Sequence, residues 1–271
     1  MARPLWFVQV LRKSFSSRFL LAKFTHAPII GKIIDRMLFH EDDIVYLPKN
    51  KTIQLNASFD PPESHPLPSQ VIEHFIEEAN YHWLMNFCLC RSSTDCQDYP
   101  IELGCLFLGE SVLDINPHLG RRVTKEEALD HLKKCQEADL VHLIGRNKID
   151  AVWLNVQDGK KLLTICNCCP CCCLWKMIPQ VSPMISNRIT KMNGISVSVT
   201  DDCTGCGTCT EDVCFVDAIH LIDGKSFISS ECRGCGRCVE VCPHDAIILT
   251  IDDELYVQET IDRIDPLVYL K

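Results

Sequence analysis

The strongest constraint on the fold of this 271-residue chain is a repeated cysteine pattern near its C-terminal end. The two runs are Cys203, Cys206, Cys209, Cys214 and Cys232, Cys235, Cys238, Cys242. The second run reads C-x2-C-x2-C-x3-C-P. This is the spacing by which one loop wraps an iron–sulfur cube with three thiolates and gives its fourth to a neighbouring cube. The first run has one extra residue before its last cysteine, and the runs start 29 residues apart, at 203 and 232. Such an internal duplication implies two equivalent sites.

The residues around these cysteines fit the same interpretation. Glycines at 205, 207, 234 and 236 let the backbone fold tightly and point its N–H groups at sulfur. Matching tails follow the two runs, Val-Asp-Ala-Ile at 216–219 and His-Asp-Ala-Ile at 244–247. Their alternating continuation predicts strands over Ile219–Ile222 and Ile247–Ile251, and a further strand over Ile195–Val199 precedes the first run.

Residues 194–251 therefore resemble the bacterial-type dicluster ferredoxins. The resemblance implies a domain of repeated ββα units that holds two [4Fe-4S] clusters. One cluster would be held by Cys203, Cys206, Cys209 and Cys242, and the other by Cys232, Cys235, Cys238 and Cys214. Phe215 stands where the family usually has proline. The alternative is a pair of zinc knuckles on the C-x2-C pairs, but zinc requires neither the third cysteine nor the repeated glycines.

A second, denser group of cysteines lies upstream. Residues 166–173 read Cys-Asn-Cys-Cys-Pro-Cys-Cys-Cys, so six thiols fall within eight residues. Soft thiolates select iron–sulfur clusters, zinc or cuprous copper, and a [4Fe-4S] cube takes four, so ten cysteines are enough for one or two further clusters. We expect both upstream segments to ligate the same cluster or cluster pair, with Arg91 stabilising the thiolate charge. The ten candidate ligands are Cys88, Cys90, Cys96, Cys105, Cys166, Cys168, Cys169, Cys171, Cys172 and Cys173.

Other candidate side chains in this part of the chain favour structural roles. Cys135 occupies an apolar helical position and is interpreted as a small buried hydrophobe. His118, His131 and His142 are candidates for ligation or proton transfer, but each is lone. With the Glu126-Glu127-Ala128 helix and the strand at 140–142, the middle of the chain resembles poorly characterised iron–sulfur proteins of anaerobes. That resemblance carries no catalytic assignment, so catalytic residues are unknown.

The expected fold class is α+β, a mixed α/β Cys-rich domain followed by the ferredoxin-type domain. Four regions are expected: a basic amphipathic segment at 1–40, the Cys-rich domain at 41–193, the ferredoxin domain at 194–251 and a C-terminal tail at 252–271. A helix is predicted to start with Ser69 as its cap, and Thr124 with Glu127 predicts a capping box. Asp158-Gly159, between apolar runs at 151–156 and 161–165, predicts a β-hairpin.

Charge and cysteine usage narrow the class of function. Residues 195–271 carry fifteen acidic side chains against five basic ones, whereas residues 1–40 carry seven basic and one acidic. The anionic end disfavours nucleic acid and favours a redox partner with a basic docking face. No stretch reaches the roughly 20 apolar residues of a membrane span. Residues 1–40 either pack on the middle domain, which is favoured, or lie on a membrane surface. Nineteen cysteines without a signal peptide favour a reducing, oxygen-poor cytoplasm.

These patterns predict an electron-transfer protein rather than a stand-alone enzyme. The alternative is a redox enzyme whose catalytic cluster lies in the Cys-rich domain and receives electrons from the ferredoxin module. A redox-sensing regulator is a more distant third class, since no basic recognition helix is evident.

Overall fold

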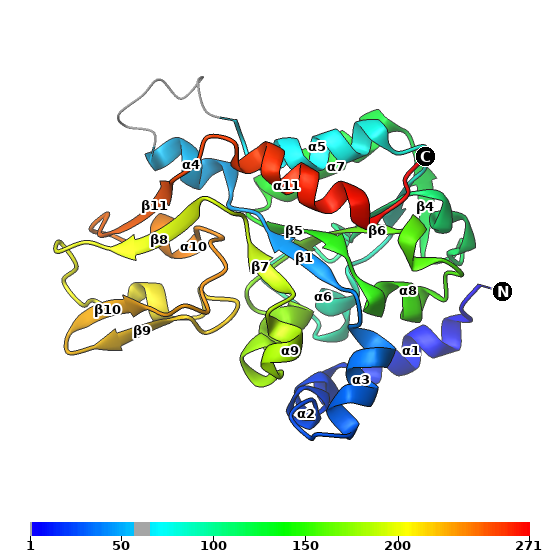
Figure 1. The fold of residues 1–271 in the computed structure, drawn as a ribbon, viewed down its shortest axis with the longest axis horizontal. Coiled ribbons are helices and arrows are strands. Elements are labelled where there is room, and N and C mark those ends of the chain that lie inside the picture. The colour runs from blue at the N-terminus through cyan, green and yellow to red at the C-terminus, as the bar shows by residue number, and fades with distance from the viewer. Residues whose placement is uncertain (1, 57–65) are drawn as a thin grey trace.

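The computed structural model describes residues 2–56 and 66–271, and in that part of the chain seven strands form one sheet (Figure 1). The strand order is β4-β2-β3-β6-β5-β1-β7. Neighbours are antiparallel except β1 and β7, which run parallel. The strands are β1 (Asp43–Tyr46), β2 (His82–Met85), β3 (Leu106–Leu108), β4 (Gly120–Val123), β5 (Val141–Arg146), β6 (Leu163–Cys168) and β7 (Ile189–Lys191).

Helices cover both faces of this sheet (Figure 1). One face carries α5 (Ser69–Glu78), α7 (Lys125–Glu137) and α11 (Tyr256–Ile264). The other carries α1 (Leu5–Ser14), α2 (Arg18–Phe24), α3 (Ile30–Leu38), α6 (Leu89–Ser93) and α8 (Lys148–Leu154). The remaining α-helices are α4 (Asn50–Asn56), α9 (Pro183–Ser186) and α10 (Arg237–Glu240). Because successive strand residues point to opposite faces, each strand contributes to both layers.

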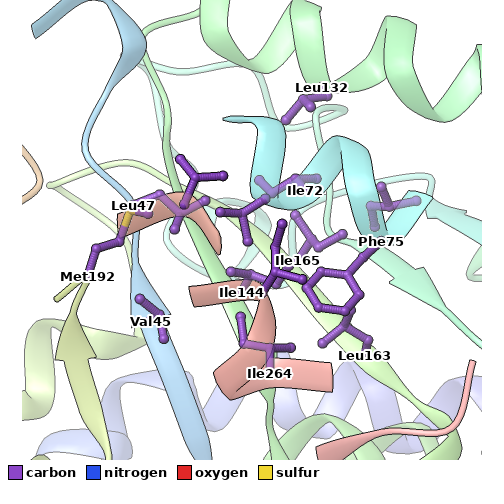
Figure 2. Packing of buried hydrophobic residues seen from close by; sticks show 14 of the residues in the cluster. Val45, Leu47, Ile72, Phe75, Leu132, Ile144, Leu163, Ile165, Met192 and Ile264 are labelled. Atoms are coloured by element: carbon purple, nitrogen blue, oxygen red, sulfur yellow. The ribbon is translucent and has the colours of Figure 1, made fainter. Parts of the chain in front are cut away.

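The face under α5 and α11 holds the main apolar core (Figure 2). Val45, Ile144 and Ile165 project from three neighbouring strands onto Phe75 and Ile264 of the two helices. Burial of each such side chain contributes about 1.5–3 kcal/mol. The opposite face takes the alternate residues of the same strands, and it is there that most of the upstream cysteines lie.

The sequence predictions for this region are partly confirmed. The capping box of Thr124 and Glu127 opens α7 as expected. Helix α5 begins at Ser69, but the prediction that Ser69 caps it is wrong: Pro68 is the cap residue, and the Ser69 hydroxyl bonds Glu73 instead. The predicted hairpin is also wrong, because residues 148–154 are helix α8.

The physical reason for α8 lies in its polar contacts. Asp150 accepts a hydrogen bond from Asn147 at the helix start and another from the indole of Trp153, both at 2.7 Å. Asp42 accepts the N–H of Lys148 in the first turn at 2.7 Å. The helix ends at Asn155, which has φ 60°, so the local Asp-Gly signal was overridden by capping and burial of Trp153.

The ferredoxin-like segment lies at one end of the sheet (Figure 1). Its strands are β8 (Ile195–Val199), β9 (Ile219–Ile222), β10 (Lys225–Ile228) and β11 (Ile247–Ile251), so all three predicted strands are confirmed. β8 pairs with β11 and β9 with β10, both antiparallel. Its buried Ile195, Ile247 and Leu249 belong to the same apolar cluster as the sheet. The whole chain is mixed α and β, as the α+β expectation requires.

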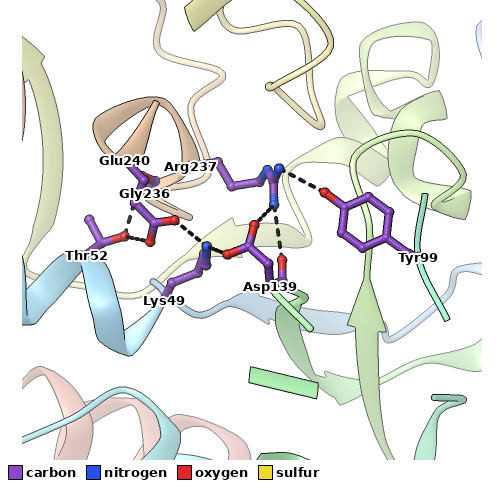
Figure 3. A network of polar contacts seen from close by, with 7 residues as sticks. All are labelled: Lys49, Thr52, Tyr99, Asp139, Gly236, Arg237 and Glu240. Carbon is purple, nitrogen blue, oxygen red and sulfur yellow. Dashed lines mark hydrogen bonds and ion pairs between the residues drawn. The ribbon is translucent and has the colours of Figure 1, made fainter. Parts of the chain in front are cut away.

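A buried polar network joins this segment to the sheet (Figure 3). Lys49 forms ion pairs with both Asp139 and Glu240, and Arg237 contacts Asp139 at 2.9 Å. Arg237 also donates to the hydroxyl of Tyr99 at 3.1 Å. The pair of Lys49 with Glu240 is less than one-tenth exposed on both sides, so water screens it little, whereas Asp139 is 46% exposed.

The N-terminal helices pack on the domain that contains the seven-stranded sheet, as expected from the sequence. Val8 of α1 and Ala22 of α2 are buried in clusters formed with the sheet face. The same helices also leave large apolar side chains in solvent, among them Trp6, Phe24 and Ile33. No helix of the described residues is long and apolar enough to cross a membrane.

Candidate metal centres

Each ferredoxin run contributes to both of two small cavities. The first ferredoxin site is lined by Cys203, Cys206, Cys209 and Cys242. The second ferredoxin site is lined by Cys214, Cys232, Cys235 and Cys238. The chain thus places the fourth cysteine of each run with the first three of the other, which is the grouping that the ferredoxin resemblance implies.

Backbone N–H groups point at the sulfurs of both sites. The amide of Ala218 donates to Cys214 Sγ at 3.2 Å, and that of Ala246 donates to Cys242 Sγ at 3.3 Å. The two tails thus make equivalent contacts, as expected for a duplicated loop. Gly205 has φ 71°, and a Cβ there would lie 1.9 Å from the carbonyl oxygen of Gly224, so this loop needs glycine. N–H···S bonds favour ionised sulfur, so both loops suit an anionic thiolate cluster.

The two ferredoxin sites differ in exposure. Cys206 of the first site is exposed, whereas burial raises the pKa of Cys235 in the second site to about 12. Exposed carboxylates surround the first site, including Asp202, Glu211 and Asp245. The first site is therefore the more exposed of the two, and acidic residues adjoin its cysteines in the sequence.

On the α1 face of the sheet, the upstream cysteines line a larger cavity of about 320 Å³, here termed the thiol cavity. Antiparallel pairing of Leu106 with Ile165 sets Cys105 beside Cys166 at the ends of β3 and β6. Strand alternation then puts Cys168 on the same side as Cys166. The thiol of Cys173 donates to Cys168 Sγ at 3.0 Å. The cysteines that line the cavity are Cys88, Cys90, Cys105, Cys166, Cys168, Cys169 and Cys173.

Two arginines, Arg18 and Arg91, line this cavity, and Arg91 is fully buried. It donates to the backbone carbonyl of Asn167 at 2.8 Å and to that of Leu103. Among the described residues, no carboxylate lies within ion-pair distance of it. Burial alone would lower the pKa of Arg91, but the charges of Cys88 and Cys169 thiolates raise it above its ordinary value. A buried cation needs a compensating charge, and only the sulfurs are placed to supply it.

Cys88 shows the effect of this environment on a thiol. A hydrogen bond from Cys90, assisted by the charge of Arg91, lowers the pKa of Cys88 to about 7. The pKa of its partner Cys90 shifts in the opposite direction, because the same hydrogen bond and burial both raise it. The cavity therefore holds at least one thiol that ionises near neutral pH, as a metal ligand must.

The remaining upstream cysteines form a second, tighter group, here termed the four-thiol site. The Sγ atoms of Cys96, Cys169, Cys171 and Cys172 all lie within 4.8 Å of one another. Cys169 also lies in the wall of the thiol cavity. Both upstream segments thus contribute to both groups, which is how a shared pair of centres would be built.

The other candidate residues line none of the four cysteine groups. Cys135 is fully buried in α7, and no sulfur of the four groups bonds it among the described contacts. His118 is exposed. His131 donates from Nε2 to the backbone carbonyl oxygen of Gly104 at 3.0 Å, and burial lowers the pKa of His131. His142 is bonded to Asn167 at 2.8 Å, and burial lowers the pKa of His142 to about 4, so it is neutral at pH 7.

Tyr46 is a residue that sequence reasoning missed. It is fully buried on β1, lines the second ferredoxin site and meets Phe215 edge-on at 5.8 Å. The pKa of Tyr46 is raised well above its ordinary value. Burial is the largest cause, and the charges of Cys173, Cys168 and Cys235 add to it. Tyr46 therefore lies between the thiol cavity and the second ferredoxin site. Nothing in the sequence marks the position of Tyr46 between the two sites.

Comparison with known proteins agrees with the C-terminal geometry. The family described as 4Fe-4S binding domain matches residues 226–248, which include the whole second cysteine run. No curated protein and no solved structure matches the chain. The protein is therefore an iron–sulfur protein. More specifically, it contains a ferredoxin-type 4Fe-4S binding domain and binds at least one [4Fe-4S] cluster.

Proposed function

We propose that this protein transfers electrons through two [4Fe-4S] clusters, one in each ferredoxin site, to or from a further cluster in the thiol cavity. The observation that carries the proposal is the pair of four-cysteine cavities, each completed by a cysteine of the other run. When bound, such clusters exchange single electrons at a potential set by N–H···S bonds, charge and solvent exposure.

The chain's own residues define a route. The first ferredoxin site meets solvent at Cys206, so it exchanges electrons with the external partner. The second ferredoxin site is more buried and borders Tyr46, whose other neighbours are the Cys168 and Cys173 thiols. The acidic surface around the first site complements a partner with a basic docking face. In this proposal the protein acts in the cytoplasm of an anaerobic cell and does not bind nucleic acid.

Counting iron and sulfide after anaerobic reconstitution tests the proposal. About eight irons per chain correspond to the ferredoxin sites alone, and twelve or more to an additional cluster. Replacing both Cys88 and Cys166 by alanine should lower the count by about four, whereas Cys135→Ala, which removes a buried thiol outside the cavity, should leave it unchanged. Four irons or fewer in the wild-type protein would contradict the two-cluster assignment.

A redox enzyme is the second candidate, and the thiol cavity is the observation that favours it. Its seven thiols exceed the four that a single cube takes, and its volume leaves room beside them for a small molecule. Apolar side chains of the N-terminal helices, including Phe7, Leu11 and Phe15, complete the wall. A small exogenous ligand that alters the spectrum of this centre, and not those of the ferredoxin sites, would establish an open iron and favour the enzyme.

A further inference from the structure

The four-thiol site has a geometry that differs from the other cysteine groups. Cys96 follows α6, whereas Cys169, Cys171 and Cys172 lie in the turn after β6, on either side of Pro170. The Sγ atoms of Cys171 and Cys172 are 3.5 Å apart, and those of Cys96 and Cys171 are 3.6 Å apart. All four sulfurs fit within 4.8 Å of one another.

These separations decide between a single ion and a cube. Four thiolates around one tetrahedral ion at about 2.3 Å must stand about 3.8 Å from each other. In a [4Fe-4S] cube each thiolate binds a different iron at a different corner, so the four sulfurs stand further apart. In the structure two pairs are separated by 3.5 and 3.6 Å and the others by at most 4.8 Å, which agrees with the single ion.

The other cysteine groups provide an internal comparison. Among the described residues, no other set of three or more His, Cys, Asp or Glu side chains brings its ligand atoms within this distance. The two ferredoxin sites therefore keep their sulfurs further apart in the same molecule. A single close pair also occurs in the thiol cavity, where Cys173 and Cys168 lie 3.0 Å apart. What distinguishes the four-thiol site is that four sulfurs lie close together at once.

The surroundings fit a closed thiolate site. The backbone N–H groups of Asp98 and Tyr99 bond Cys96 Sγ, and Arg91 bonds Cys169. Cys169 and Cys172 are at most 5% exposed. Four thiolates around a divalent ion carry a net charge of −2, which these donors and the Arg91 cation offset.

We propose that Cys96, Cys169, Cys171 and Cys172 bind a single tetrahedral metal ion of the zinc type, which is structural and separate from the iron–sulfur clusters. Binding converts four thiols to thiolates and releases their four protons. The ion cross-links the loop after α6 to the turn after β6. It thereby holds Tyr99 where its hydroxyl receives the hydrogen bond from Arg237 of the ferredoxin segment (Figure 3).

Metal analysis of the full-length protein tests this assignment. After anaerobic purification with both iron and zinc supplied, we expect about one zinc per chain. The variant Cys96→Ala/Cys171→Ala should lose that zinc and keep the wild-type iron and sulfide content. Cys135→Ala is the matched control, because Cys135 is buried in the same apolar cluster as Cys169 and Cys172. It should keep both metals.

X-ray absorption at the zinc edge of the wild-type protein gives a readout that does not depend on folding of a variant. Four sulfur neighbours at about 2.3 Å with no nearby iron would support the site. Zinc ligated by nitrogen or oxygen, no zinc with all four thiols free, or loss of about four irons in the double variant would each overturn it. Loss of about four irons would mean that the four cysteines bind a cube instead of a single ion, and the proposed electron-transfer function would still stand. A wild-type iron content of four or fewer would contradict the electron-transfer function and leave the zinc site untouched.

Discussion

Replacement of Arg91 tests whether the upstream cysteines hold an anionic centre. Arg91→Met removes the charge but retains an apolar side chain. It leaves the carbonyl oxygens of Leu103 and Asn167 without their buried donors. Each unsatisfied carbonyl costs about 1–3 kcal/mol, so the two cost about 2–6 kcal/mol. If metal-bound thiolates balance the guanidinium, the loaded protein should lose roughly 3 kcal/mol more, because a buried charge then lacks its partner.

The assay is urea unfolding under anaerobic conditions, followed by tryptophan fluorescence in metal-loaded and metal-depleted protein. Trp153 and Trp175 border the thiol cavity and report on it. Arg91→Lys, which keeps the charge, should lose about 1–3 kcal/mol in both forms. Arg121→Met removes an exposed ion pair with Glu127 and should cost less than about 1 kcal/mol. If Arg91→Met destabilises the metal-loaded and metal-depleted protein equally, the charge argument is refuted. Arg91 would then only hydrogen-bond the backbone carbonyls.

The remaining predictions concern the ferredoxin sites, the surface and pH. Cys214→Ala should damage the second ferredoxin site rather than the first, and paramagnetic resonance of the reduced variant should then lose the coupled signal while the first site persists. Electron delivery to a basic partner should slow as salt rises, since exposed charges are screened beyond about 10 Å at 0.1 M; a salt-independent rate would argue for an apolar docking face. If the N-terminal helices touch membranes, anionic vesicles should bind the protein and Phe24→Ser/Ile33→Ser should weaken that binding in a flotation assay. Burial raises the pKa of Asp42 to about 8, so its contribution to stability falls as pH rises from about 4 to 8. The gain in unfolding free energy from Asp42→Asn should therefore grow over that range, to about 4 kcal/mol at pH 7, and a pH-independent gain would contradict it.

The ferredoxin segment could be predicted in detail because its determinants are local. Three of its strands were predicted to the residue, and the loops between them are fixed by glycines and closely spaced cysteines. The fourth ligand of each site comes from the other run, but the duplication itself implies that exchange. Short sequence separations leave few conformations for such loops, so spacing is enough to specify them.

The middle of the chain shows where local signals fail. The capping box at Thr124 depends on residues three apart and was predicted correctly. The hairpin at Asp158-Gly159 was predicted incorrectly, because burial of Trp153 and its bond to Asp150 favour a helix there. The bond to Asp150 spans only three residues, but the burial of Trp153 depends on the sheet face beneath α8, which no short window of sequence contains.

By itself, the sequence determined that this chain ligates metal with thiolates, where its ferredoxin strands lie and which cysteines are candidates. Only the tertiary structure decided how the ten upstream cysteines divide between the thiol cavity and the four-thiol site. That division follows from the pairing of β3 with β6, which sets Cys105 beside Cys166, and from the turn after β6, which carries Cys171 to Cys96. The placement of Arg91 and Tyr46 between centres has the same origin. Strand register is set by burial of a whole face, so contacts between residues far apart in the sequence are not encoded in any local pattern.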